Sequence, residues 1–152
     1  MPFSQRHARL DEEAHAFERS CTEFRCDVSS LEQALARARA DMFAMRMRVD
    51  EHAVMGAGIP WFCCPFGRDS LLASYEALTL SPCLAVETLR TLAAYQGKKD
   101  DPFTEEEPGK ILHELRFGEM SRTGETPHRP YYGSVDATPL FVVVLDATFE
   151  TT

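Results

Sequence analysis

The stretch GRDSLLASYEALTLSPCLAVETLRTLAAYQG, residues 67–97, contains two apolar repeats of helical spacing separated by only a few residues. The first repeat consists of Leu71, Leu72, Tyr75 and Leu78, and the second of Leu84, Ala85, Leu89, Leu92 and Ala93. Ser81-Pro82 is typical of a helix start, and Gly97 is typical of a helix end. Because almost nothing joins the two helices, we expect an antiparallel helical hairpin.

The stretch before this hairpin, from Gly56 to Gly67, is dense in glycine, proline and aromatic residues. That composition predicts an irregular loop. Asp69 or Ser70 would then cap the first helix of the hairpin. The charge pair formed by Arg68 and Asp69 is therefore expected at a helix N-terminus.

Farther upstream, Ser29 and Ser30 open an amphipathic segment with capping-box spacing. Its apolar positions, which predict a helix with one buried stripe, are Leu31, Leu35, Ala38, Met42, Met45 and Val49. Residues 1–28 are expected to be an irregular or helical lead-in. We expect residues 1–152 to form a single partial domain, that is, one domain or part of a larger one.

Downstream of the hairpin, residues 98–130 are polar and rich in glycine and proline. Only ILHELRF (111–117) alternates enough to predict a short strand, so most of this segment is expected to be a long loop. Thr138-Pro139 then begins the apolar run LFVVVLDATF. Its valines are typical of a buried strand, whereas Thr138 as a cap and Pro139 after it are typical of a helix start. On these residues alone, a strand and a helix both remain open.

Composition narrows the classes of function. The chain has 152 residues, 44% of them hydrophobic, and a formal net charge of -8. This acidic balance, without a basic cluster, argues against a nucleic-acid partner. No apolar run is long enough for a membrane span, and the N-terminal stretch lacks the apolar core of a signal peptide, so we expect a cytoplasmic protein. Five cysteines without metal-ligand spacing support neither a disulfide framework nor a zinc site.

Arg68 and Asp69 allow two interpretations. In the structural one, the aspartate caps a helix and the arginine pairs with a nearby acid. In the functional one, the pair binds a sugar, because a carboxylate accepts hydrogen bonds from hydroxyls and a guanidinium donates them in a fixed fork. Trp61 and Phe66 could cover the apolar face of the sugar ring.

The segment EEEPGKILHELRFGEM (105–120) gives a weaker signal. His113 and Glu114 are adjacent, so on a strand their side chains would point to opposite faces. This argues against a joint metal site, and the second histidine of an H-E-x-x-H motif is also missing. No metal or other cofactor is expected.

Asp136 lies within PHRPYYGSVDATPLF (127–141) and also allows two interpretations. It could cap the following helix, a role that Thr138 would fill equally well. Alternatively, it could be a carboxylic acid among tyrosines, where desolvation raises its pKa and keeps a proton available for a leaving group. Composition does not separate the two.

Three motifs, in this order and at this spacing, resemble the bacterial amylo-alpha-1,6-glucosidase family, also called glycogen-debranching-type glucosidases. They are GIPWF-x-x-x-FGRDSLL, EEPGKILHE-x-R-x-GEM and PYYGSVDATPLF, and the resemblance runs from about Leu31 to Phe149. It implies a mainly α fold, with residues 29–152 as the N-terminal part of an (α/α)6 toroid of helical hairpins. About four helices and a long irregular active-site loop would be present, with a helix after Thr138, and the fold could include a short β-hairpin.

The resemblance also implies a glycoside hydrolase that acts on terminal alpha-linked glucose in an alpha-glucan or a glucosyl small molecule. Arg68 and Asp69 would bind hydroxyls of the terminal glucose, and Asp136 would be the general acid. The remaining residues expected to line the sugar-binding pit are Trp61, Phe66, His113, Glu114 and Tyr132.

In the family, the toroid and its general base continue beyond the position that matches Thr152. The chain is therefore expected to be a fragment that shows no turnover by itself and that self-associates through exposed helix faces. A second hypothesis is a carbohydrate-binding or regulatory remnant without catalysis. A third is a helical interaction protein whose loop residues contact a partner.

Overall fold

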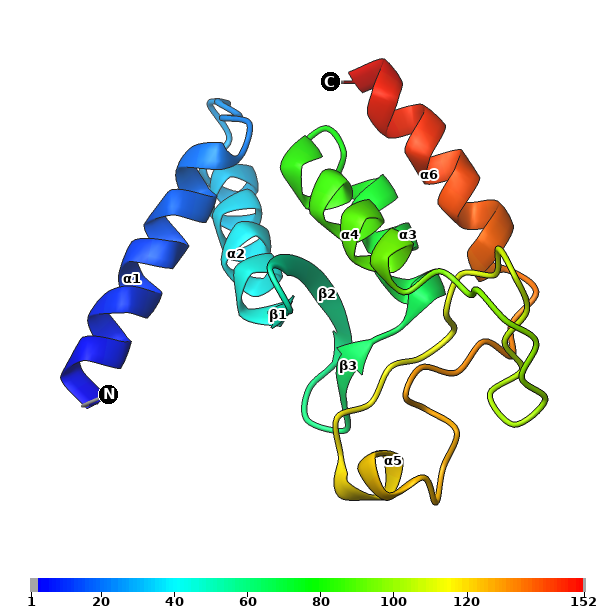
Figure 1. The fold of residues 1–152 in the computed structure, drawn as a ribbon. Coiled ribbons are helices and arrows are strands. Elements are labelled where there is room, and N and C mark those ends of the chain that lie inside the picture. The colour runs from blue at the N-terminus through cyan, green and yellow to red at the C-terminus, as the bar shows by residue number, and fades with distance from the viewer. Residues whose placement is uncertain (1–2, 152) are drawn as a thin grey trace. The chain divides into compact units, whose positions relative to one another are not determined.

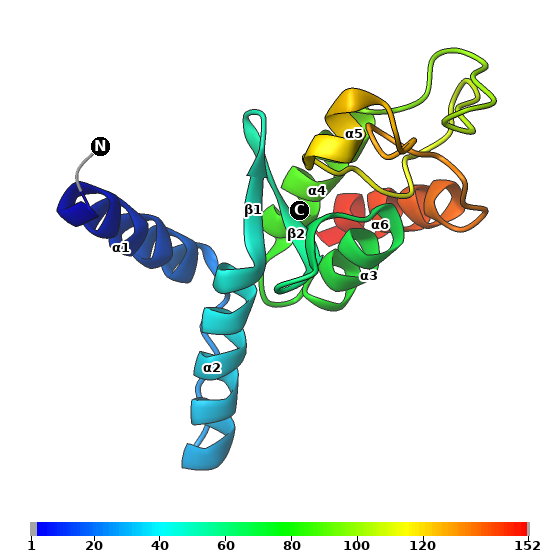
Figure 2. The ribbon, with the colours of Figure 1, turned by 90° about the horizontal axis from the view of Figure 1, so that it is seen from below.

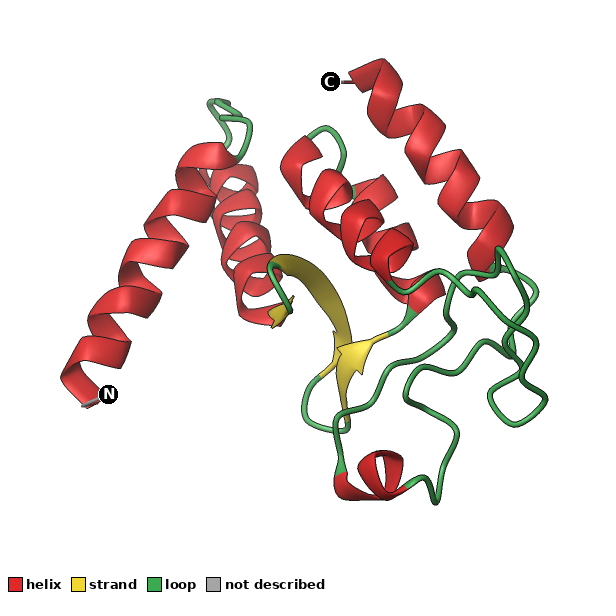
Figure 3. Cartoon of the chain, viewed as in Figure 1, coloured by secondary structure: helices red, strands yellow, loops and turns green. Residues whose placement is uncertain are grey.

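The computed structural model describes residues 3–151, which form helices and antiparallel strands (Figure 1; Figure 3). The elements are α1 (Phe3–Ser20), α2 (Ser29–Met45), β1 (Arg46–Val49), β2 (His52–Gly58), β3 (Phe62–Pro65), α3 (Gly67–Glu76), α4 (Pro82–Ala94), α5 (Glu119–Thr123) and α6 (Ala137–Thr151). The chain divides into two compact units, one up to Ala44 and the other from Met45 onward.

The predicted mainly α, partial (α/α)6 toroid is wrong. Within residues 3–151, the helices accompany a three-stranded antiparallel sheet of order β1-β2-β3, so the fold is mixed α and β. Helical hairpins do not follow one another along the second unit. Strands take up the chain before α3, and the chain between α4 and α6 is mostly irregular (Figure 3).

The first unit contains the helices α1 and α2. Between them, the ring of Phe17, which is 6% exposed, contacts the ring of Phe43 with 5.9 Å between the centroids. The lead-in is therefore helical over α1, and α2 begins at Ser29 as predicted. The predicted buried stripe is wrong, since no residue of α2 is buried and Leu31 is 50% exposed.

The second unit opens with a β-hairpin over residues 46–58, where the sequence predicted the end of a helix and the start of a loop. The helical period extends to Val49, but α2 ends at Met45 and β1 follows directly. The hairpin register pairs Arg46 with Met55 and Val49 with His52. The two-residue turn between the strands includes Asp50 in the left-handed region, with φ 53°. The alternation of arginine with Met47 and Val49 also fits a strand, and pairing with β2 decides between the two periods.

The stretch predicted as an irregular loop is largely strand as well. β2 extends to Gly58 and pairs antiparallel with β3, with a register irregularity between Gly56 and Gly58. β2 is the central strand, and both α3 and α4 pack against it. Because Val54 on this strand is fully buried, the sheet forms one wall of the core.

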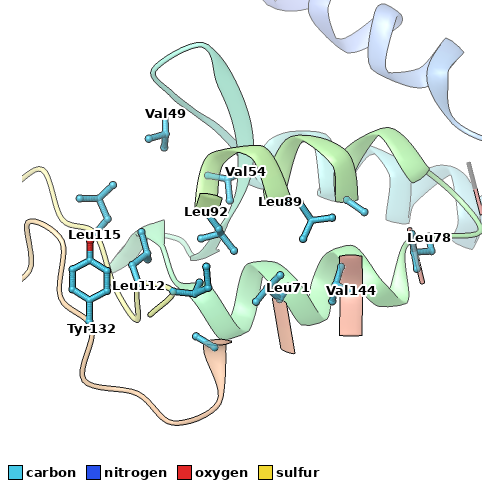
Figure 4. Packing of buried hydrophobic residues seen from close by; sticks show 13 residues of the cluster. Val49, Val54, Leu71, Leu78, Leu89, Leu92, Leu112, Leu115, Tyr132 and Val144 are labelled. Carbon is cyan, nitrogen blue, oxygen red and sulfur yellow. The ribbon is translucent and has the colours of Figure 1, made fainter. Parts of the chain in front are cut away.

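α3 and α4 form the predicted antiparallel hairpin, which Figure 4 shows around the core. α4 begins at Pro82 after Ser81, as predicted, and ends before Gly97. The predicted cap of α3 is wrong, because the N-cap residue is Phe66 and the hydroxyl of Ser70 donates to the carbonyl of Met55 at 2.8 Å. Leu71, Leu84, Leu92 and Val144 are among the largest fully buried side chains. Full burial of each such leucine contributes about 2 kcal/mol.

The apolar run after Thr138 forms α6, so the helical alternative is confirmed. α6 packs against α3 and α4 in the second unit. Figure 2 shows α3 and α6 side by side from below. Within residues 3–151, no helix combines the length and the apolar character needed to cross a bilayer.

Instead of the predicted strand over residues 111–117, two isolated antiparallel bridges join Glu114 to Phe66 and to Tyr131. Around them, the amide of Gly67 donates to the carbonyl of His113 at 2.9 Å, and the amide of Tyr131 donates to the carbonyl of Glu114 at 2.9 Å. These bonds place the three motif segments side by side at the start of α3.

Candidate functional site

A hollow of about 770 Å³ lies where α3 and α6 begin. This volume is within the range of small-molecule sites. Its wall includes Arg68, Glu105, Lys110, His113, Ser134 and Asp136. Two of these side chains are basic and two are acidic, and they come from three segments far apart in the sequence. The hollow therefore offers both donors and acceptors of hydrogen bonds.

The close approach of α3 to its neighbours forms this hollow. A Cβ atom on Gly67 would clash with the carbonyl oxygen of Leu112 and would lie 3.1 Å from the Cβ of Ala137. The first residue of α3 thus touches both the irregular segment and the first residue of α6. Arg68 and Asp136 are the sequence neighbours of Gly67 and Ala137, so this contact brings the two charged side chains together.

Arg68 and Asp136 form an ion pair across the hollow. The Nη1 of Arg68 donates to the Oδ2 of Asp136 at 3.0 Å, and the hydroxyl of Ser134 donates to the Oδ1 of the same carboxylate. Asp69 is not on the wall of the hollow, although its Oδ2 lies 3.9 Å from the Nε of Arg68. The structure therefore joins Arg68 to Asp136 more closely than to its neighbour in sequence.

The hydrogen bond from Ser134 and the ion pair with Arg68 hold the pKa of Asp136 below its usual range, although burial opposes the shift. The prediction of a raised pKa among tyrosines is wrong, because both tyrosines point elsewhere. The hydroxyl of Tyr131 donates to Glu105 at 2.7 Å, and that of Tyr132 donates to the carbonyl of Tyr95 at 2.7 Å. The N-terminus of α6 also favours a negative charge here. Asp136 is ionised at neutral pH.

Replacing Ser134 by alanine should raise the pKa of Asp136, because the hydroxyl donates more strongly to the ionised carboxylate than to the neutral carboxyl. A depressed pKa in the folded state stabilises the fold at neutral pH, and this contribution is lost as the pH falls through that pKa. The Oγ of Ser134 also accepts from the amides of Asp136 and Ala137, at 3.4 and 3.3 Å, and these bonds do not depend on pH. The variant should therefore lose about 1 kcal/mol more stability at pH 7 than at low pH. Titration of the carboxyl carbon by NMR tests this, with Ser30→Ala on α2 as control. An unchanged pKa in Ser134→Ala would contradict it.

His113 is on the wall of the hollow, whereas the predicted aromatic residues Trp61 and Phe66 do not line it. The ring of Phe66 meets the ring of His113 edge-on, with 5.5 Å between the centroids. The Nδ1 of His113 is buried and has no hydrogen-bond partner among residues 3–151. Trp61 lies between β2 and β3, is 80% exposed and is not on the wall. Phe66 supports the wall without lining it.

Glu114 and Tyr132 lie outside the hollow and inside the protein. Glu114 is 5% exposed, and its carboxylate pairs with Arg116 and with the Nε2 of His128 at 3.4 Å. Tyr132 is 3% exposed, and burial raises its pKa to about 12. His113 and Glu114 face different surroundings, as their adjacency predicts. Both Glu114 and Tyr132 hold the fold together around the hollow.

The sequence did not identify Glu105, Lys110 and Ser134 as site residues. Ser134 stands two residues before Asp136, a spacing at which a hydroxyl can bond locally, so a local signal was present. Lys110 donates to the carboxylate of Glu107 at 2.7 Å and to the carbonyl of Glu105 at 3.1 Å. The positions of Glu105 and Lys110 depend on the path of a long irregular segment, which no periodicity encodes.

Within residues 3–151, no group of three or more His, Cys, Asp or Glu side chains is placed to hold a metal ion. No protein-family model matches the chain, and no curated protein matches it. The hollow is therefore interpreted from the chemistry of its own residues.

Proposed function

We propose that this protein binds terminal alpha-linked glucose in the hollow and supplies Asp136 as the general acid for hydrolysis of the glycosidic bond, with no turnover expected of the chain by itself. One observation carries the proposal: Arg68 donates to Asp136 at 3.0 Å although the two residues are 68 positions apart in the sequence. The two residues come from two of the three motifs that resemble the amylo-alpha-1,6-glucosidase family. His113, from the third motif, is on the same wall.

The chemistry of the wall suits a neutral polyol. A guanidinium such as that of Arg68 donates to hydroxyl oxygens, and the carboxylates of Asp136 and Glu105 accept from hydroxyl protons. The ring nitrogens of His113 can donate or accept a hydrogen bond. Because the wall of the hollow carries both basic and acidic groups, its electrostatic potential does not favour a strongly charged ligand of either sign.

In hydrolysis, Asp136 would donate a proton to the glycosidic oxygen while water adds to the anomeric carbon and passes a proton to a general base. The ionised Asp136 must first take up a proton. Entry of a sugar that separates its carboxylate from Arg68 would raise its pKa and allow this. By resemblance to the family, the reaction would proceed with inversion.

A second candidate function is carbohydrate binding without catalysis. The lowered pKa of Asp136 favours it, since an ionised carboxylate accepts hydrogen bonds but donates no proton. Proton uptake on binding isomaltose, measured by calorimetry in buffers of different ionisation enthalpy, separates the two candidates. Uptake that is lost in Asp136→Asn would support a general acid, whereas binding without proton uptake would support the second candidate.

Arg68→Ala should weaken the binding of methyl alpha-glucopyranoside by about tenfold or more, because a charged hydrogen-bond donor is lost. Calorimetric titration of the unmodified protein and the variant measures this. Arg90→Ala removes an exposed arginine from α4 and should leave the affinity unchanged. Equal affinity in the unmodified protein and Arg68→Ala would show that the hollow is not the sugar site.

A further inference from the structure

Glu105 is the residue of the hollow with the most unusual backbone. Its φ of 54° is in the left-handed region, which glutamate rarely adopts, and this conformation costs on the order of 1 kcal/mol. Asp101 and Glu106 exchange two backbone hydrogen bonds, at 3.0 and 3.1 Å, and so close a turn that holds Glu105 in place. Lys110 also donates to its carbonyl at 3.1 Å. Several contacts thus fix a strained residue on the wall.

The side chain of Glu105 is positioned by Tyr131 and Gly133. The hydroxyl of Tyr131 donates to the Oε1 of Glu105 at 2.7 Å, and this contact raises the pKa of the phenol. A Cβ atom on Gly133 would lie 2.9 Å from the Oε2 of Glu105 and would clash with the phenol oxygen. Glycine at position 133 is therefore what allows the glutamate and the tyrosine to lie over the chain next to Ser134.

The carboxylate of Glu105 keeps acceptor capacity for a ligand. A carboxylate has about four lone-pair sites. Within residues 3–151, the Oε1 takes one hydrogen bond from Tyr131 and the Oε2 takes none. By contrast, Asp136 already accepts from Arg68 and Ser134. Of the two acidic groups in the hollow, Glu105 is the one ready to accept from a hydroxyl.

We propose that Glu105 is a specificity-determining residue of the hollow, which accepts a hydrogen bond from a sugar hydroxyl and disfavours sugars that carry a negative charge. The inference rests on the proposed function. A neutral glucoside gains an acceptor across the hollow from Arg68. The cations of the wall are already paired, Arg68 with Asp136 and Lys110 with Glu107. Within residues 3–151, the carboxylate of Glu105 has no such cationic partner, so a sugar acid or a sugar phosphate bound beside it would meet an uncompensated like charge, which repels at short distance.

The test compares methyl alpha-glucopyranoside with glucuronate and glucose 6-phosphate in NMR titrations of the full chain. Glu105→Gln keeps the shape of the side chain and removes its charge. We expect it to weaken binding of the glucoside by about tenfold, and to strengthen binding of the two anions relative to the glucoside. Tyr131→Phe, which frees the carboxylate without removing it, should weaken glucoside binding by about threefold. Asp100→Asn, an exposed acid in the same irregular segment, should change neither preference.

The outcomes distinguish a failure of the proposed role of Glu105 from a failure of the proposed sugar-binding function. If the glucoside binds and Arg68→Ala weakens it, but Glu105→Gln keeps both the affinity and the preference for the neutral sugar, the role of Glu105 is wrong and the sugar site stands. If the unmodified protein binds no glucoside, both are wrong. If Glu105→Gln fails to fold, the comparison of Tyr131→Phe with the unmodified protein decides, and unchanged binding in that variant overturns the inference.

Discussion

Replacing Gly67 by alanine should destabilise the second unit by about 3 kcal/mol or more, the largest effect expected of any single methyl group added to it. The new Cβ would clash with the carbonyl oxygen of Leu112. A backbone atom cannot rotate away as a side chain can. The amide of Gly67 also donates to the carbonyl of His113 at 2.9 Å, so moving the helix to relieve the clash would break this hydrogen bond.

Urea denaturation followed by circular dichroism measures the loss. Gly118→Ala is a matched control, since a Cβ on Gly118 would have no neighbour within 4 Å and the residue has an ordinary φ of -68°. It should stay within about 0.5 kcal/mol of the unmodified protein. If Gly67→Ala were equally neutral, α3 would not approach the irregular segment as closely as described, and the contact between Arg68 and Asp136 would lose its structural basis.

Glu114→Gln should destabilise the protein by about 2 kcal/mol, because it removes the charge from a buried carboxylate that pairs with the guanidinium of Arg116. Arg116 and His128 both pair with this carboxylate, whose side chain is only 7% exposed. Arg116 is 37% exposed, so water can partly replace the lost partner, and the loss stays below that of a fully buried pair. The variant keeps the backbone bridges to Phe66 and Tyr131.

Thermal and urea denaturation of Glu114→Gln, compared with Glu76→Gln, isolate the effect of burial. Glu76 is exposed at the end of α3, and its change should be close to neutral. A Glu114→Gln variant as stable as the control would mean that the carboxylate contributes only packing. Because Glu114 is outside the hollow, glucoside binding by the folded variant should remain within about threefold of the unmodified protein.

The helical hairpin of the second unit could be predicted because its signals are local. Ser81 and Pro82 set the start of α4, and the apolar repeats set its buried face. The sheet could not be predicted in the same way. The residues from Met45 to Val49 satisfy a helical period and a strand alternation at once, and only pairing with His52–Gly58 decides between them. The predicted toroid, which the resemblance implied, is wrong because these residues form strands.

The candidate site was predictable in part for the same reason. Arg68 and Asp136 could be identified from their motifs, but their contact depends on the close approach at Gly67, which is a tertiary feature. One of the two interpretations that the sequence left open placed Asp136 among the neighbouring tyrosines, whereas Ser134 and Arg68 lower its pKa. Glu105 gave no local signal, because nothing in the identity of a glutamate indicates a left-handed φ.

The amide of Arg116 donates to the carbonyl of His128 at 2.7 Å, so the polypeptide leaves the core and returns to it at nearly the same point. The excursion between these residues carries α5. The entropy cost of lengthening this loop is small, since doubling the length of a loop adds only about 0.6 kcal/mol to the cost of closing it. Residues 117–127 are thus a stretch where insertions and deletions can accumulate during evolution without displacing the ion pair between Arg68 and Asp136.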